Sequence, residues 1–179
     1  MNQVLSIDFA TTDGAEALGR QQFEECYNRT APALRAYIKR VAGSDTVADD
    51  ILQESYLRLF SARRLAAPAL KSYLYRIATN LIMDYHRAKS RERLWEEEAS
   101  RRVELAESGV ELGADLQRLF AQVKPQERAL LWLAYVEQAE HREIAEILGL
   151  ARGSVKVLLS RARTKMESVL KENGFEGPK

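Results

Sequence analysis

Cysteine and histidine are scarce in this sequence of 179 residues: Cys26 is the single cysteine, and His86 and His141 are the two histidines. A single thiol cannot form a disulfide within the chain, and one cysteine with two histidines cannot complete a tetrahedral zinc site. We therefore expect no metal and no cofactor, and we expect Cys26 to be a buried, apolar thiol.

Long apolar runs are missing as well. The longest one, Ala129 to Val136, is far shorter than the roughly 20 residues that a helix needs to cross a bilayer. The first residues carry no basic start and include Asp8 and Asp13, which does not fit a secretory signal peptide. These absences predict a cytoplasmic protein.

Helix-breaking residues are few, with 4 prolines and 9 glycines in the chain. Because 46% of the residues are hydrophobic and 30% are charged, we expect a folded, all-α protein. The net charge is only +1, so overall basicity does not indicate a nucleic-acid partner. Any such indication must come from where the charges lie.

The stretch from residue 141 to residue 166 has the pattern of a helix-turn-helix motif. Apolar or small residues stand where two helices crossing at a tight turn require them: Ile144, Ala145, Leu148, Gly149, Leu150, Val155 and Leu158. Ala145 leaves room for the second helix, and Gly149 can adopt the positive φ that ends the first helix. The second helix is expected to begin near Arg152, where Ala151 supplies no side-chain cap.

The second helix of this motif is strongly basic. Between residues 152 and 171, six lysines and arginines stand against one acid, Glu167, which gives a net charge of +5. Such a helix fits the major groove of DNA, where its N-terminal residues approach base edges. The residues expected to read bases are Arg152, Lys156 and Ser160, and those expected to contact phosphates are Ser154, Arg161 and Arg163. A basic, solvated helix of a bundle is the less specific alternative.

A helix predicted over residues 47–62 is apolar on two sides. One side consists of Ala48, Ile51, Leu52, Ser55 and Leu59. Leu57 and Phe60 lie on the opposite side, next to acidic and amide side chains. A small domain cannot easily bury both sides, so the second side favours binding of a partner over burial in a large core.

Two further helices and a linker complete the pattern. A helix is expected from Arg20 to Val41, with Pro32 as a kink or a break. Another is expected from Lys71 to about Lys89, and residues 71–93 carry a net charge of +4. This charge forms a second basic surface, unless the helix is merely solvated. Residues 94–116 reverse the sign to −5 and contain helix-interrupting glycines, which indicates an acidic linker.

These elements predict two small helical domains. The expected organisation is a flexible leader (1–19), a helical domain (20–93), an acidic linker (94–114) and a second helical domain with the helix-turn-helix motif (115–175).

In this order and spacing, the segments resemble a bacterial RNA polymerase sigma factor of the extracytoplasmic-function (ECF) class, group 4 of the sigma-70 superfamily. The segment DDILQESYLRLF (49–60) is similar to the polymerase-binding segment of that family. The segment SYLYRIATNLIMDYHRAKSRER (72–93) is similar to its −10 segment, and EIAEILGLARGSVKVLLSRAR (143–163) is similar to its −35 reader. Together they cover about residues 20–171.

The resemblance implies roles for individual residues. Those implied to dock on the clamp helices of the largest polymerase subunit are Asp50, Gln53, Glu54 and Leu57. Those implied to hold the −10 element are Arg63, Arg64, Arg76, Asn80 and Arg87. The implied partners are core polymerase, including its flap region, promoter DNA and an anti-sigma factor, which in many relatives is linked to a membrane. The implied function is promoter recognition and DNA opening as an alternative sigma factor.

Two other classes compete with this interpretation. A helix-turn-helix repressor or activator with a sensing or dimerising N-terminal domain explains residues 144–163, but not the second basic helix or the exposed Leu57 side. An enzyme is disfavoured because Asp84 and His86 stand two positions apart on a helix and face apart, so they form no catalytic triad. We therefore expect no catalytic residue.

Overall fold

The computed structural model describes the backbone of residues 20–62, 70–99 and 118–175, with side chains for 23–62, 70–92 and 118–175. Within these ranges the regular structure is entirely helical, so the predicted all-α class is confirmed. None of the helices described is long and apolar enough to cross a membrane. The predicted leader and most of the predicted acidic linker lie outside the described residues, and the domain boundaries remain predictions.

The first helix, α1 (Arg20–Ala42), is continuous over 23 residues and contains Pro32. This proline therefore does not divide the segment into two helices. The side chains of Leu34, Ile38 and Val41 recur at helical spacing and are fully buried. Gly43 follows the helix at φ +76°, a conformation that side-chain-bearing residues rarely adopt.

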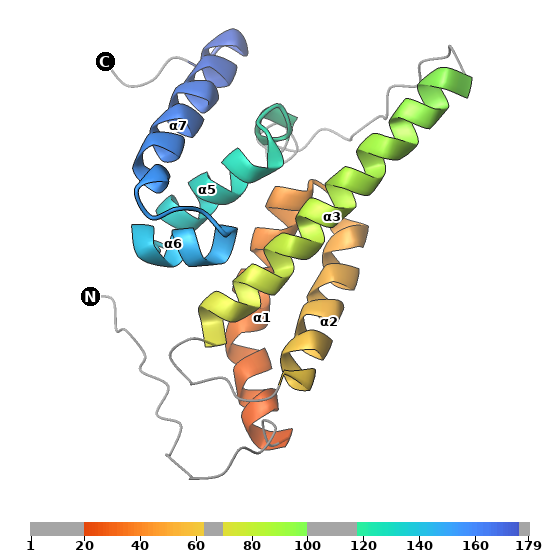
Figure 1. Ribbon diagram of the computed structural model, residues 1–179, viewed down its shortest axis with the longest axis vertical. Coiled ribbons are helices and arrows are strands. Elements are labelled where there is room, and N and C mark those ends of the chain that lie inside the picture. Colours follow the sequence, from red (N-terminus) through yellow and green to blue (C-terminus); the bar gives the residue numbers. More distant parts are fainter. Residues whose placement is uncertain (1–19, 63–69, 100–117, 176–179) are drawn as a thin grey trace.

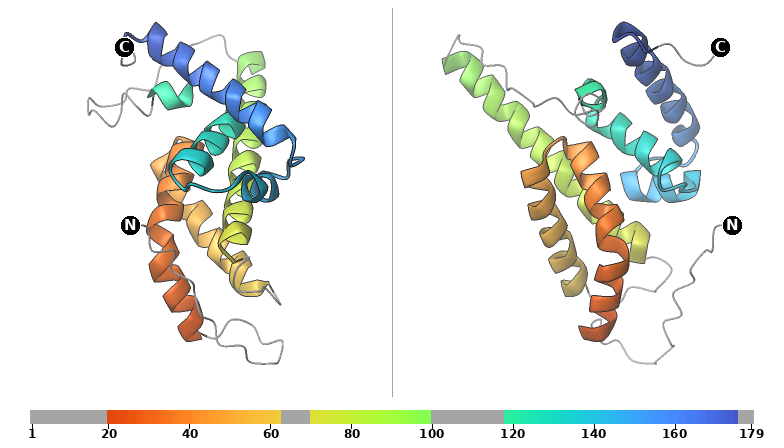
Figure 2. Two further views of the ribbon diagram at one scale, coloured as in Figure 1. Left: turned by 90° about the vertical axis from the view of Figure 1, so that its left-hand side faces the viewer. Right: turned by 180° about the vertical axis from the view of Figure 1, so that it is seen from behind.

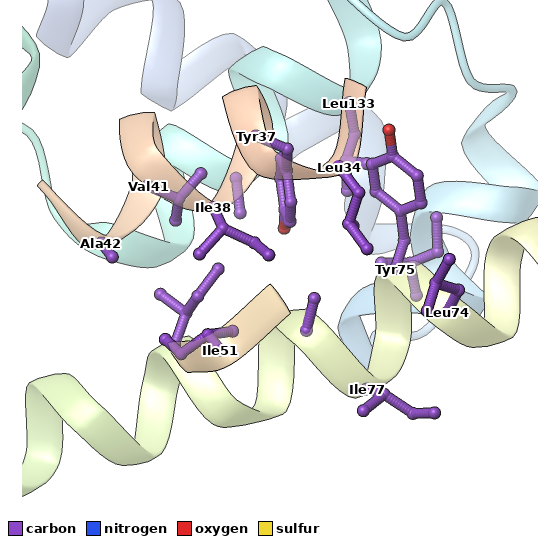
Figure 3. Packing of buried hydrophobic residues seen from close by; sticks show 14 of the residues in the cluster. Leu34, Tyr37, Ile38, Val41, Ala42, Ile51, Leu74, Tyr75, Ile77 and Leu133 are labelled. Atoms are coloured by element: carbon purple, nitrogen blue, oxygen red, sulfur yellow. The ribbon is translucent and has the colours of Figure 1, made fainter. Parts of the chain in front are cut away.

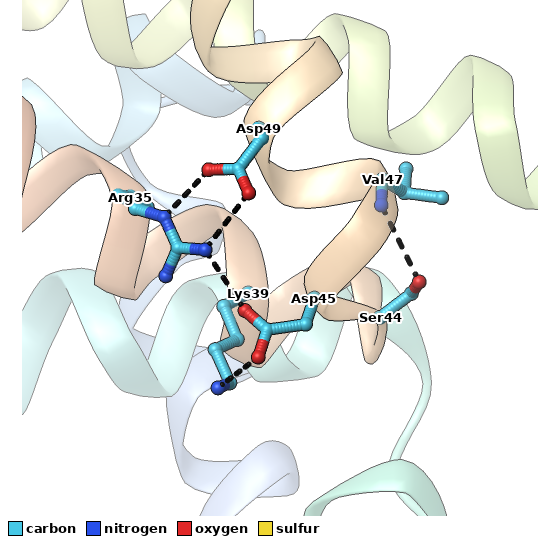
Figure 4. Close-up of polar contacts among 6 residues, drawn as sticks. All are labelled: Arg35, Lys39, Ser44, Asp45, Val47 and Asp49. Carbon is cyan, nitrogen blue, oxygen red and sulfur yellow. Dashed lines mark hydrogen bonds and ion pairs between the residues drawn. The ribbon is translucent and has the colours of Figure 1, made fainter.

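The second helix, α2 (Asp45–Ser61), is held against α1 by charged side chains (Figure 4). Arg35 donates to Asp49 at 2.6 Å and to Asp45 at 3.1 Å, and Lys39 donates to Asp45 at 2.6 Å. The hydrogen bond from Arg35 holds the pKa of Asp49 below its ordinary value. Because these groups are exposed, they orient the two helices more than they stabilise them.

A long third helix, α3 (Leu70–Ala99), crosses both α1 and α2. Leu74 and Ile82 are fully buried against them, and burial of each such side chain contributes about 2 kcal/mol. The hydroxyls of Tyr37 and Thr79 lie 2.7 Å apart inside this core, which satisfies two buried polar groups. Figure 3 shows Tyr37 among the apolar side chains of α1, α2 and α3. The helix extends ten residues beyond Lys89, so the first residues of the predicted linker are helical.

The C-terminal helices form the predicted helix-turn-helix. A single helical turn at residues 118–121 precedes α5 (Pro125–Tyr135), α6 (His141–Leu148) and α7 (Ser154–Glu172). Gly149 ends α6 at φ 63° and ψ 36°, as its position predicted. Ala145 is buried, and its carbonyl accepts the N–H of Leu150 at 2.9 Å.

The two groups of helices pack against each other. Helices α5 and α6 lie on α1 and α3, and α7 lies outermost (Figures 1 and 2). Buried side chains from both groups form one hydrophobic cluster, which runs from Cys26 in α1 to Ala162 in α7 and includes Leu133 in α5. The buried state expected for Cys26 is confirmed.

We expect His86 to make the fold sensitive to acid. Its Nε2 lies 3.1 Å from the carbonyl oxygen of Val41, and burial lowers the pKa of its imidazole below the ordinary value of 6.5. The unfolded chain therefore binds this proton more readily than the folded chain does. We expect the unfolding free energy to fall as the pH drops below about 6.5.

Urea unfolding between about pH 7.5 and about pH 5.5 measures this dependence. His86→Gln should flatten the loss of stability over that interval. His141→Gln, at an exposed position, should leave it unchanged. A slope that is the same in both variants would contradict the assignment.

Candidate nucleic-acid and polymerase interfaces

The residues expected to contact −35 DNA lie on the exposed side of α7 and in the turn before it. Lys156, Ser160 and Arg163 recur at intervals of four and three residues along α7, and all are exposed. Val155, Leu159 and Ala162 point the opposite way and are buried. The basic side of α7 is therefore free for a ligand.

The start of α7 differs from the expectation. The helix begins at Ser154 rather than near Arg152, and its N-cap residue, Gly153, makes no side-chain hydrogen bond. The physical reason is that neither Ala151 nor Arg152 can cap a helix. Arg152 thus lies in the turn, where its Nη2 is 3.7 Å from the Glu146 carboxylate.

Val157 belongs to the same exposed side of α7 and was missed by the sequence reasoning. Its exposed fraction is 52%, although it is apolar, and it lies between Lys156, Ser160 and Arg161 around the helix. The sequence did contain a sign of this position, because Val157 is apolar but does not fit the spacing of the apolar residues on the buried face. An apolar side chain among these groups could contact a thymine methyl.

The residues expected to bind polymerase share one side of α2. Asp50, Gln53, Glu54 and Leu57 follow the i, i+3, i+4, i+7 spacing of a single helix face. Leu57 is 54% exposed, while Leu52 and Leu59 are buried on the other side. The two-sided character predicted for this helix is therefore present. Glu54 also forms an ion pair with Arg58, in which Arg58 Nε lies 2.7 Å from a Glu54 carboxylate oxygen.

An aromatic groove borders Leu57. It has a volume of about 350 Å³ and is lined by Phe23, Tyr27, Asp49, Leu52, Gln53, Tyr56 and Leu57. Phe23 packs edge-to-face against Phe60, whose exposed fraction is 46%. This apolar area extends the predicted polymerase-binding face from α2 onto α1.

The residues expected at the −10 element are only partly described. Arg76, Asn80 and Arg87 are exposed on α3. Arg63 and Arg64 lie outside the described residues. Asp84 forms an ion pair with Arg87, as is also expected of a merely solvated helix. Arg87 nonetheless keeps a 72% exposed side chain and can exchange partners.

Helix α6 covers part of this side of α3. Ser72 donates to Glu143 at 2.7 Å, and Lys71 lies 3.2 Å from Glu137, whose side chain is only 10% exposed. A groove of about 630 Å³ separates Arg76 and Tyr73 from the acidic side of α6. The carboxylates of Glu143 and Glu146 therefore lie close to the exposed side of α3.

Among the residues described, no three His, Cys, Asp or Glu side chains are grouped so that they could hold a metal ion.

Family models match both halves of the chain. The model "Sigma-70 region 2" matches residues 26–92, and the model "Sigma-70, region 4" matches residues 114–166. The α2 and α3 surfaces lie in the first match, and the helix-turn-helix lies in the second. Two such regions in this order define a protein of the sigma-70 type.

Comparison with named relatives identifies the group within the sigma-70 family to which the chain belongs. SigL of Mycobacterium tuberculosis, an ECF RNA polymerase sigma factor, is 30% identical over 175 residues, or 92% of this chain and 98% of SigL. SigE of Mycolicibacterium smegmatis is 28% identical over 163 residues, and the match spans 63% of its length. The chain therefore belongs to the ECF RNA polymerase sigma factors of the sigma-70 family.

Solved structures share the fold. RpoE from Bartonella quintana, crystallised with the anti-sigma factor NepR, matches with a TM-score of 0.67 and 23% identity over 84% of this chain and 98% of that one. CnrH, solved with the cytosolic domain of CnrY, matches with a TM-score of 0.63 and 19% identity. The match covers 87% of this chain and 92% of the CnrH chain.

Proposed function

We propose that this protein is an alternative sigma factor that binds core RNA polymerase, recognises −10 and −35 promoter elements and helps to open the DNA. The observation that carries the proposal is the presence of two separate basic surfaces, on α3 and α7, in one chain with an exposed apolar side on α2. A helix-turn-helix repressor requires only the second of these surfaces.

In this proposal each surface has its own task. The exposed side of α7 enters the major groove at −35, while Arg76, Asn80 and Arg87 hold the −10 strand. The α2 side with Asp50 and Leu57 docks on polymerase. Two moderate DNA contacts joined through one polymerase gain from effective concentration, so neither surface needs to bind tightly alone. Work of this kind is recognition, not catalysis, and takes place in the cytoplasm.

Docking must also separate α6 from α3. Glu143 and Glu137 lie beside the −10 side of α3 in the compact chain, and a phosphate backbone cannot occupy the same space. Polymerase that binds the two halves at distant sites supplies the free energy for this opening. An anti-sigma factor, the kind of partner named for the RpoE structure, would act by holding the surfaces closed or covered.

Run-off transcription with core polymerase tests the function. Addition of the chain should produce transcripts from a defined set of promoters. Specific duplex binding by the free chain, with no association with core polymerase, would instead support the repressor alternative.

Leu57→Glu should abolish promoter-dependent transcription, because it places a charge in the apolar contact with polymerase. Its affinity for core polymerase, measured by fluorescence anisotropy, should fall at least about tenfold, or about 1.4 kcal/mol. Phe175→Glu, a similar change at another exposed apolar residue, serves as the control. Normal core affinity in a folded Leu57→Glu protein would show that α2 is not the docking side.

Lys156→Ala should weaken −35 binding by roughly 1–3 kcal/mol and reduce base preference. Arg163→Ala should weaken binding to all sequences evenly, because a phosphate contact carries no base information. Competition binding against a panel of single-base −35 variants measures both effects. Unchanged selectivity in the Lys156 variant would remove it from the base-reading set.

Val157 should favour thymine at one −35 position through its C5 methyl group. Replacing that thymine with uracil removes one methyl, so wild-type affinity should fall by about 0.8 kcal/mol, or fourfold. In Val157→Ser the same replacement should have almost no effect. A thymine-to-uracil penalty that persists in Val157→Ser would assign the methyl contact to another residue.

A further inference from the structure

A second groove, of about 930 Å³, lies between α3 and the start of the C-terminal helices. One wall is formed by α3 from Thr79 to Arg91, and the other by residues 121–126 with Arg128 and Leu148. The groove is rich in groups that are or can become positively charged: His86, Arg87, Arg91, Lys124 and Arg128. Its described lining contains no aspartate or glutamate. A groove of this charge is suited to an anion.

Arg128 is the main indication of an anion site, because it is buried without an acidic partner among the described residues. Only 5% of the residue is exposed, and its buried Nε has no hydrogen-bond partner among the residues described. Its guanidinium packs near the end of α1, so that a Cβ added to Gly43 would lie 3.3 Å from Nη1. Burial lowers the pKa of this guanidinium, since no carboxylate of the described residues offsets the loss of water. A buried, uncompensated charge is unfavourable, and a bound anion would relieve it.

Two acids that stand near the groove in sequence are already engaged. Asp84 forms its ion pair with Arg87, and a Glu127 carboxylate oxygen accepts the backbone N–H of Lys124 at 3.1 Å. The side chains of Arg91 and Lys124 are exposed, and within the described part of the chain neither has an ion pair. Arg91 on α3 and the two C-terminal residues Lys124 and Arg128 thus remain available to bind one ligand.

We propose that this groove binds a small molecule with two or more phosphate groups, of the size and class of a nucleoside polyphosphate. Its volume is in the range that accommodates ligands of that size. Arg91, Lys124 and Arg128 hold the phosphates through charge-assisted hydrogen bonds. Met83 offers apolar contact to a base, and Asn80 offers an amide for hydrogen bonding.

Such a ligand would regulate the protein. It contacts α3 and the C-terminal helices at once and therefore stabilises their packing. It also occupies Asn80 and Arg87, which are proposed here for −10 DNA, so ligand and promoter strand exclude each other. The binding site itself does not rest on the promoter assignments.

The test titrates the full chain, without polymerase or added metal, with ATP, GTP and inorganic tripolyphosphate in isothermal titration calorimetry. We expect saturable one-to-one binding of at least one of the two nucleotides below about 1 mM. Arg91→Gln with Lys124→Gln should weaken it at least about tenfold. The matched control, Lys165→Gln with Lys171→Gln, removes the same charge from exposed positions on α7 and should change it less than about twofold. Arg128→Met should fold with equal or higher melting temperature and lose the stabilisation by nucleotide.

The proposal would be overturned if neither ATP nor GTP showed saturable binding. Equal weakening of binding in the test and control double variants would also overturn it, as would unimpaired nucleotide stabilisation in folded Arg128→Met. A short single-stranded oligonucleotide that binds the groove more tightly than either nucleotide would also overturn it, because the groove would then be a DNA contact. Binding is measured on the free chain and transcription on the holoenzyme, so failure of this proposal is distinguishable from failure of the promoter function.

Discussion

The packing of α5 and α6 against α1 and α3 is the constraint on which the other features of this molecule depend. It joins two family regions into one hydrophobic cluster and places the nearly buried Glu137 carboxylate between Lys71 and the indole of Trp132. An ion pair in such a place favours one arrangement of the two halves more than it adds stability, because removing charges from water offsets much of their attraction. The same packing decides which surfaces are free.

The two DNA-facing surfaces are affected differently by this arrangement. The exposed side of α7 lies away from the shared core and is accessible in the compact chain. The −10 side of α3 is partly covered by α6, whose Glu143 binds Ser72. Under the proposed assignments, the compact chain can meet −35 DNA but cannot bind a −10 strand fully. This suits a factor that opens DNA only when it is attached to polymerase. The basic groove beside Arg128 lies at the same junction, so a ligand there acts on the same equilibrium.

Local sequence patterns predicted the features that depend on neighbouring residues. Gly149 and Ala145 specified the tight turn, and the spacing of Leu57 relative to Leu52 and Leu59 specified a helix with an exposed apolar side. Features that depend on distant residues were not accessible in this way. The Ser72 to Glu143 hydrogen bond joins residues 71 positions apart, and both would look like ordinary solvated groups in a sequence. Arg128 likewise resembles a surface arginine until the end of α1 is placed over it.

The compact arrangement can be measured by pulsed electron spin resonance, with nitroxide labels at exposed Lys89 of α3 and Glu167 of α7 in a Cys26→Ala background. The account predicts a single narrow distance distribution in the free chain and a longer distance once core polymerase is bound. A broad distribution in the free chain, or a narrow one that does not change on binding polymerase, would contradict it.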